Sequence, residues 1–189
     1  YFLQSSALLI FGSTQRSVES AVKVPNVAVG DFTISGNAIF TLAITIVLMI
    51  CLTWFINKTM TGKAMLAVSE DKGAAQLMGV NVNKTIAITF LIGSALAAVA
   101  GVLYIASYGF VGPYTGSLPG IKAFVAAVLG GIGSVPGAML GGILLGIIES
   151  LSKAYISTQL ADAIVFGVLI VVLLVKPTGL LGKKVIEKV

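Results

Sequence analysis

The sequence predicts an all-α, polytopic membrane protein, a bundle of helices that cross a bilayer several times. Hydrophobic residues make up 57% of the 189 residues, charged residues make up 10%, and the mean hydropathy is +1.06. Soluble domains carry about 25% charged residues, so this chain has too few to cover a water-facing surface. Its charge-free runs have the length of spanning helices, whereas the strands of a membrane barrel are shorter and alternate in polarity.

The residue types that are scarce narrow the range of functions. The chain has one cysteine, Cys51, and no histidine, so it cannot form an intramolecular disulfide and lacks the commonest metal ligand and general base. We therefore predict no catalytic residue, no metal site and no bound cofactor. The net charge of +5 comes from lysines in short loops beside apolar runs. This pattern is typical of membrane topology and not of a nucleic-acid-binding face.

The N-terminal part predicts a fragment of a larger protein. Residues 1–11 are apolar and do not start with methionine, which indicates the end of a helix whose beginning is missing. We predict that residues 1–189 form one transmembrane domain that lacks its N-terminal spans. Residues 12–36 form a polar connection outside the cytoplasm, in which "VAVGDFTISG" predicts a short hairpin.

Two long charge-free spans follow this connection. The first is Ala38–Ile56, which reaches about 28 Å as a helix and so matches the bilayer core. Asn37 is placed to cap its start, and Trp54 suits the aromatic belt at the membrane interface. The second is Thr85–Ser107, rich in alanine and glycine.

Three further apolar segments complete the predicted bundle. Ile121–Ile132 is only about 18 Å long as a helix, too short to cross alone. It is extended, tilted, or a half-helix within the protein. Val135–Leu151 and Ala161–Val175 are the next helices, and Asp162 lies in the first turn of the last one, where the helix dipole favours an anion.

The lysines predict the orientation of the bundle. They concentrate in two places, the connection 57–84 and the segment after the last helix, at Lys58, Lys63, Lys72, Lys84, Lys176, Lys183, Lys184 and Lys188. The other connections carry only Arg16, Lys23, Lys122 and Lys153. The positive-inside rule therefore places residues 57–84 and the C-terminus in the cytoplasm. The number of crossings agrees if the short helix and its successor form an in-and-out pair or a re-entrant hairpin.

Glycines are dense between residues 130 and 146. Two sets of small residues recur every four positions, Gly133, Gly137 and Gly141, and Ala138, Gly142 and Gly146. On helices they form a groove that another backbone can approach closely, so we predict a helix-packing role. The alternative is that they line a path or let helices slide. The "GGIGS" run is not followed by Gly-Lys-Ser/Thr, so it does not predict a phosphate loop.

Glu149 and Lys153 are four residues apart in the same segment. At this spacing an acid N-terminal to a lysine forms a local pair that contributes about 0.2–0.5 kcal/mol. An acid within a membrane segment also suggests a proton or substrate path. The position of Glu149 near the end of its helix favours the local pair.

The segment "GKAMLAVSEDKGAAQLMGVN", residues 62–81, is the most informative part of the chain. Met65 and Val68 recur at helical spacing, a polar break follows, and a second short helix is predicted with Asp71 as its cap and Gly79 at its end. One interpretation is an amphipathic helix on the lipid headgroups. The other is a docking surface on which Glu70 and Asp71 offer carboxylates to a partner protein. The residues alone leave both open.

Three blocks together resemble a known family. "GKAMLAVSEDKGAAQLMGVN", "AFVAAVLGGIGSVPGAMLGGILLGIIES" and "KPTGLLG" are similar to the membrane permease of bacterial branched-chain amino acid ABC importers. The resemblance extends from about Phe32 to Gly182, and the chain is more similar to the shorter of the two paired permeases.

The resemblance implies a multi-pass subunit of the cell inner membrane with several partners. These are a second permease subunit, a cytoplasmic ABC ATPase that hydrolyses ATP, and an extracytoplasmic amino-acid-binding protein, with no nucleic acid involved. It also implies that the loop 57–84 inserts a coupling helix into the ATPase. The residues it assigns to ATPase coupling are Lys63, Glu70, Asp71, Ala74, Ala75 and Gly79.

The chain departs from the wider importer pattern at the coupling helix. Many importer permeases carry Glu-Ala-Ala-x-x-x-Gly there. Ala74, Ala75 and Gly79 match this motif, whereas Gly73 stands in place of the glutamate. The Ile-x-Leu-Pro that follows in those proteins is absent, since Thr89–Ile92 occupies its place. Contacts of other importers therefore do not transfer directly to this chain.

The predicted function is that of a permease subunit which moves leucine, isoleucine or valine inward and couples ATPase movement to alternating access. The main alternative is a secondary carrier or channel whose loop is an amphipathic helix on the membrane surface. A membrane scaffold would explain the glycine packing but not the loop.

Overall fold

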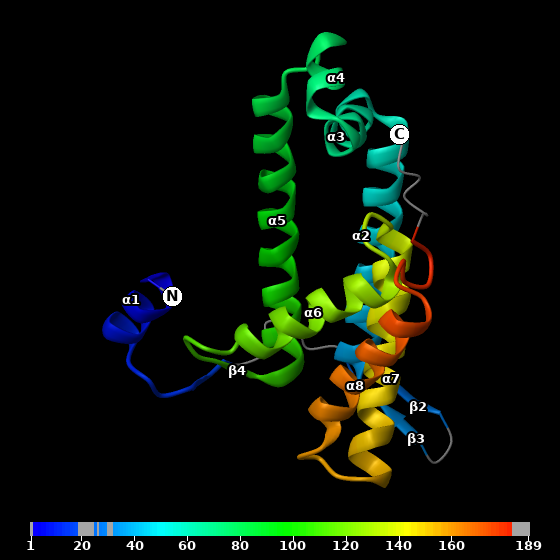
Figure 1. Ribbon diagram of the computed structural model, residues 1–189. Coiled ribbons are helices and arrows are strands. Elements are labelled where there is room, and N and C mark those ends of the chain that lie inside the picture. Colours follow the sequence, from blue (N-terminus) through cyan, green and yellow to red (C-terminus); the bar gives the residue numbers. More distant parts are fainter. Residues whose placement is uncertain (1, 19–24, 26, 30–31, 183–189) are drawn as a thin grey trace. The chain divides into compact units, whose positions relative to one another are not determined.

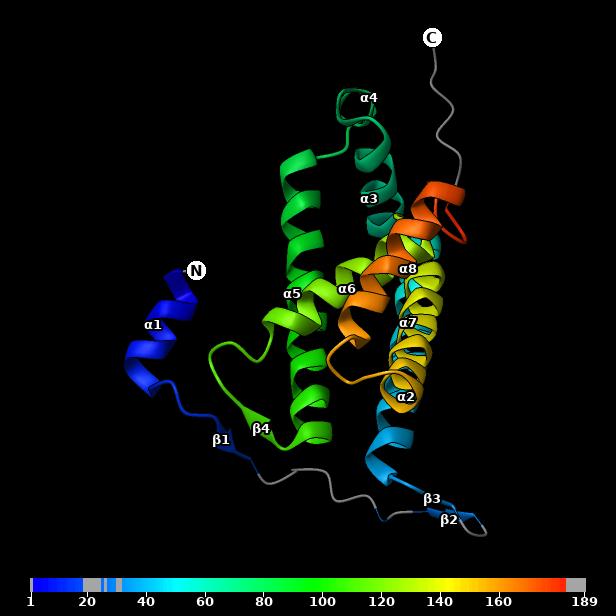
Figure 2. The ribbon, with the colours of Figure 1, turned by 60° about the horizontal axis from the view of Figure 1, so that its bottom comes forward.

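The structure is a computed structural model that describes residues 2–18, 25, 27–29 and 32–182. The chain divides into two compact units, Tyr1–Thr115 and Gly116–Val189, and each is described by itself. Helices dominate both units, and the strands are two or three residues long. Figures 1 and 2 show this helical character from two directions. The predicted all-α membrane fold is confirmed.

The first unit combines two long helices with short flanking elements. In chain order its elements are α1 (Phe2–Phe11), β1 (Arg16–Ser17), β2 (Val27–Val29), β3 (Phe32–Ile34), α2 (Gly36–Lys58), α3 (Met60–Glu70), α4 (Lys72–Leu77), α5 (Val82–Tyr108) and β4 (Phe110–Val111). β2 and β3 pair antiparallel, with Val27 opposite Ile34, which confirms the predicted hairpin. β1 pairs antiparallel with β4, a contact between distant segments that local sequence does not indicate.

α2 and α5 are the two long apolar helices of this unit, and they run in opposite directions (Figure 1). Both are long and apolar enough to cross a membrane, as is α7 (Val135–Tyr155) in the second unit. The expectation that Asn37 caps α2 is wrong. The helix begins at Gly36, and the Asn37 amide instead donates to the Ala106 carbonyl of α5 at 3.0 Å. Ser35 occupies the N-cap position of α2. The Asn37 side chain therefore lies inside the first turn, where it bonds the neighbouring helix.

The second unit consists of α6 (Ser117–Gly130), α7, α8 (Ala161–Val175) and a C-terminal stretch described to residue 182. Its core is formed where the three helices meet, by Val125, Ala126, Leu129, Leu145 and Val165. Val165 and Leu129 are among its most completely buried side chains. α8 has the predicted bounds, and α7 extends four residues beyond the predicted Leu151.

α6 differs from the predicted segment Ile121–Ile132. It starts at Ser117 because Pro119 lies in the first turn, where a missing N–H costs no helical hydrogen bond. It ends at Gly130 because Gly131 adopts a φ of +107°. Lys122, counted with the connections but also the second residue of the predicted segment, lies inside α6. With 14 residues the helix is about 21 Å long and still shorter than the bilayer core.

Candidate functional site

The loop between α2 and α5 folds into two short helices, α3 and α4 (Figure 1). A tight corner separates α2 from α3. Thr59 caps α3, since its Oγ1 accepts from the Gly62 N–H at 3.0 Å while donating to the Phe55 carbonyl at 2.7 Å. A Cβ on Gly62 would overlap the carbonyl oxygens of Phe55 and Ile56. Only glycine allows α3 to turn this closely against the end of α2.

Asp71 separates the two short helices. Its backbone is extended, and its Oδ1 accepts from the N–H groups of Gly73 and Ala74 at 2.8 and 3.0 Å. These bonds satisfy two donors at the start of α4 that have no helical partner. The predicted cap is confirmed, and one carboxylate oxygen is therefore committed to local structure. Glu70, at the end of α3, is exposed.

Gly79 closes α4 as the sequence predicts. It adopts a φ of +84°, which a residue with a Cβ reaches only at a cost. Its N–H donates to the Gln76 carbonyl, and the Val80 N–H donates to the Ala75 carbonyl, both at 3.0 Å. This pair of bonds is the Schellman arrangement, which satisfies carbonyls at a helix end. α4 thus has a defined start and a defined end although it has only six residues.

The residues predicted for ATPase coupling fall into two groups in this geometry. Lys63, Glu70 and Ala74 are exposed and can be touched by a partner. Asp71 and Gly79 shape α4, and Ala75 is only 4% exposed. Two strongly exposed apolar side chains at the end of α4, Leu77 and Met78, were not among the predicted coupling residues, although they are 92% and 84% exposed. Two apolar residues directly before Gly79, which ends the helix, could have indicated this exposed apolar tip.

A shallow cavity lies beside α4. It has a volume of about 600 Å³ and is lined by Lys72, Gln76, Val80 and Asn81, among others. The Asn81 side chain caps α5 by accepting from the Lys84 N–H at 3.0 Å. The exposed loop surface therefore combines an apolar tip with a polar, lysine-bearing hollow.

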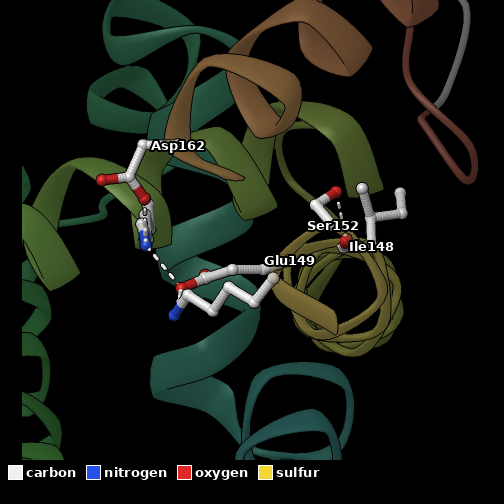
Figure 3. A network of polar contacts seen from close by, with 6 residues as sticks. Ile148, Glu149, Ser152 and Asp162 are labelled. Carbon is white, nitrogen blue, oxygen red and sulfur yellow. Dashed lines mark hydrogen bonds and ion pairs between the residues drawn. The ribbon is translucent and has the colours of Figure 1, made fainter. Parts of the chain in front are cut away.

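A second polar cluster lies in the unit formed by α6, α7 and α8 (Figure 3). The predicted pair is confirmed, with Lys153 Nζ 2.5 Å from Glu149 Oε1. The same carboxylate oxygen lies 2.8 Å from Lys122 Nζ, which also lies 2.7 Å from Asp162 Oδ1. The ion pairs of Lys122 were not predicted from the sequence because its partners lie on two other helices.

The predicted packing glycines occupy different environments. A Cβ on Gly137 or Gly141 would overlap backbone atoms of α6, at Gly130 and Ala126 respectively. Gly142 is looser, since its Cβ would lie 3.9 Å from the Ala126 Cβ. Gly133 is in the turn before α7 with a φ of +90°, and a Cβ on Gly146 would meet no atom within 4 Å. Close backbone approach within this unit therefore involves Gly137 and Gly141.

Among the described residues there is no group of three or more His, Cys, Asp or Glu side chains that could hold a metal ion. The carboxylates of the second cluster are paired with lysines. Within the described part of the chain the arrangement suits docking and helix positioning.

Comparison with known proteins identifies the family. The family model described as "Branched-chain amino acid transport system / permease component" matches residues 2–174. The chain belongs to this permease family. No solved structure matches it.

Relatives support this assignment along most of the chain. The high-affinity branched-chain amino acid transport system permease protein LivH of Escherichia coli K12 is 54% identical over 146 residues, which are 77% of this chain and 47% of LivH. LivH of Salmonella typhimurium is 45% identical over 198 residues, covering 100% of this chain and 62% of that protein. BraD of Pseudomonas aeruginosa, which carries the same description, is 44% identical over 193 residues, with the same two coverages.

The chain thus spans about half to three fifths of the length of these permeases. Its long apolar helices and its family together make it part of a multi-pass membrane permease.

Proposed function

We propose that this permease is a subunit of an ATP-driven importer that moves branched-chain amino acids across the cell inner membrane. The names of its relatives describe high-affinity branched-chain amino acid transport, and the same substrate class is proposed for this chain. ATP hydrolysis takes place in a separate cytoplasmic ABC ATPase. A second permease subunit completes the path, and an extracytoplasmic binding protein delivers the amino acid.

The observation that carries this proposal is the build of α4. A six-residue helix alone is unstable in water, yet here it is capped at its start by Asp71 and closed by Gly79. α4 contacts α3 and α5, and its own Ala75 is buried. α4 is a short helix with defined ends, and Leu77 and Met78 are exposed at its tip. These features suit a docking helix that transmits a movement of the ATPase to the membrane helices.

We assign each predicted coupling residue a role on the basis of its position in the loop. Lys63, Glu70 and Ala74 contact the ATPase, and Leu77 and Met78 insert as its apolar anchor. Asp71, Ala75 and Gly79 act by holding α4 in shape. The lysines around the loop support a cytoplasmic position of residues 57–84 and of the C-terminus by the positive-inside rule. Residues 12–36 then lie on the extracytoplasmic side.

A secondary carrier or channel is the second candidate. The observation in its favour is the same exposed apolar tip, with Met60 also 85% exposed, because such side chains enter the headgroup region when a helix lies on the membrane surface. The two functions differ in what covers α4, protein or lipid.

Site-specific crosslinking distinguishes them. The complete permease, with Cys51 replaced, carries a single cysteine in place of Ala74 or, as a matched control, in place of the adjacent Ala75. Both variants are assembled with the ATPase in inside-out vesicles and treated with a short reagent that has one thiol-reactive end and one photoreactive end, with and without ATP. Ala74 is exposed and Ala75 is 4% exposed, so the two positions differ in accessibility and not in side-chain size.

We expect the Ala74→Cys variant to crosslink to the nucleotide-binding subunit with an efficiency that ATP changes, and the Ala75→Cys variant to react little. Labelling of Ala74→Cys by a lipid-soluble reagent alone, without any protein crosslink in either condition, would reject the coupling role. Uptake of radiolabelled leucine into proteoliposomes then tests the substrate class separately.

A further inference from the structure

All charged residues of α6, α7 and α8 meet in one place. α6 carries one charged residue, Lys122; α7 carries Glu149 and Lys153; and α8 carries Asp162. Three otherwise apolar helices therefore place every charge that they have in a single network of zero net charge. Such charges are costly within or beside a bilayer unless they are paired, and here each one has a partner.

Lys122 is the centre of this network. Its Nζ lies 2.8 Å from Glu149 Oε1 on α7 and 2.7 Å from Asp162 Oδ1 on α8. Among the described residues, Lys153 forms its ion pair with Glu149, one turn away on its own helix. Figure 3 shows Glu149 and Asp162 directed toward the same point from two helices. Without Lys122, no described ion pair would join these three helices to one another.

The opposite end of α6 is held by backbone contacts. The Leu180 N–H donates to the Leu129 carbonyl and the Leu181 N–H donates to the Gly130 carbonyl, both at 2.9 Å. These bonds belong to residues 176–182, the "KPTGLLG" block, which we call the C-terminal strap. A Cβ on Gly131 would overlap the backbone of Gly182, so the strap lies directly against the turn that follows α6.

We propose that Lys122 is a positioning residue that locks the first half of α6 to the adjoining ends of α7 and α8, so that the three helices move as one body during transport. The strap holds the other end of α6. This inference rests on the proposed importer function, since it concerns the movement that such a cycle requires.

The alternative to a lock is a gate, and the two differ in whether the ion pairs break during the transport cycle. In a gate the ion pairs break and re-form in each cycle, and a permanent link between the helices stops transport. In a lock they stay formed throughout, and a permanent link is harmless. Partly exposed pairs contribute little energy, and the side chains of Lys122 and Asp162 are 25% and 46% exposed. Energy alone does not decide between the two, whereas a covalent link does.

The test uses the assembled transporter with Cys51 replaced and cysteines in place of both Lys122 and Asp162, which leaves the Glu149–Lys153 pair intact. A short bifunctional thiol reagent links α6 to α8. A monofunctional reagent of similar size on the same variant is the control for modification itself. The readout is the initial rate of leucine uptake per assembled complex, measured together with ATP hydrolysis.

We expect the crosslinked complex to transport faster than the same variant treated with the monofunctional reagent, because the covalent link replaces the lost lock. Loss of transport on crosslinking, with uptake retained after monofunctional treatment, would overturn the proposal in favour of a gate. If the unmodified wild-type complex does not take up leucine, the proposed substrate fails, and the crosslink is then judged by ATP hydrolysis.

Single substitutions give an independent measurement if the double-cysteine variant does not assemble. Lys122→Met is expected to lower the rate per assembled complex by about two- to fivefold, the range that loss of a partly exposed ion pair produces, with the KM for leucine unchanged. Lys122→Arg, which keeps the charge, is expected to restore the wild-type rate. A lower amount of complex with a normal rate per complex would show a role in folding only and would overturn the positioning role.

Discussion

The contact between α6 and α7 allows a sharp test, because two glycines on the same helix should respond in opposite ways to the same change. A Cβ on Gly141 would overlap the Ala126 carbonyl oxygen, a backbone atom that cannot rotate away. A Cβ on Gly146 would meet no atom within 4 Å. Both residues lie in the interior of α7, so Gly→Ala gives both the same gain in helix propensity.

The expected magnitudes follow from these two terms. Gly→Ala in a helix interior stabilises by up to about 1 kcal/mol, whereas overpacking a tight contact costs about 1–3 kcal/mol. Gly146→Ala should therefore be neutral or stabilising, and Gly141→Ala should lower the free energy of unfolding by up to about 2 kcal/mol.

Thermal unfolding of the complete permease in detergent, followed by intrinsic fluorescence, measures the difference. Both variants are compared with wild type at the same protein and detergent concentrations. The reasoning would be refuted if Gly141→Ala unfolds at or above the temperature of Gly146→Ala. In that case the helices separate by a few tenths of an ångström at no cost, and glycine is not required at this contact.

Three further predictions concern other parts of the chain. Asp71→Ala should destabilise α4 by about 1 kcal/mol while Asp71→Asn retains most of the cap, measured as faster amide exchange in the loop. Gly79→Ala should cost about 1–2 kcal/mol because its φ of +84° disfavours a Cβ, and unchanged proteolysis of the loop would contradict this. Asn37→Leu should remove the side-chain hydrogen bond to the Ala106 carbonyl. This should weaken the contact between the start of α2 and the end of α5, measured as increased reactivity of a cysteine placed at Ser107.

Local features of the fold were predictable from the sequence because short-range physics fixes them. The bounds of α8, the cap at Asp71 and the Glu149–Lys153 pair depend on residues at most a few positions apart. The start of α6 was predicted four residues too late, at Ile121 instead of Ser117. Asn37 was misassigned because its partner, Ala106, lies on another helix.

The candidate site was predictable in its location but not in its surface. Spacing located α3 and α4, yet which side of α4 is buried depends on how it packs against α3 and α5. That packing hides Ala75 and leaves Ala74 open, although the two alanines are adjacent and equivalent in the motif. Lys122 was missed for the same reason. Its partners become neighbours only when α7 and α8 fold back beside α6.

A four-residue repeat of small residues indicates that helices pack closely, but it does not show which members of the repeat make the contact. A four-residue repeat advances about 400° on a helix with 3.6 residues per turn, so successive members shift by about 40° around the axis. A groove along one face therefore fits only a short partner. α6 provides such a partner, since it ends at Gly130 and meets α7 at Gly137 and Gly141.

Beyond that contact the two helices continue with larger side chains, among them Val125 of α6 and Leu145 of α7 in the hydrophobic core. The ion pair between Lys122 and Glu149 lies at this far end. Glycine packing near the turn and charge pairing away from it thus act on the same two helices in succession. A helix about 21 Å long, too short to be held by spanning the bilayer, is fixed in this way along its whole length, which is the condition for α6, α7 and α8 to move together.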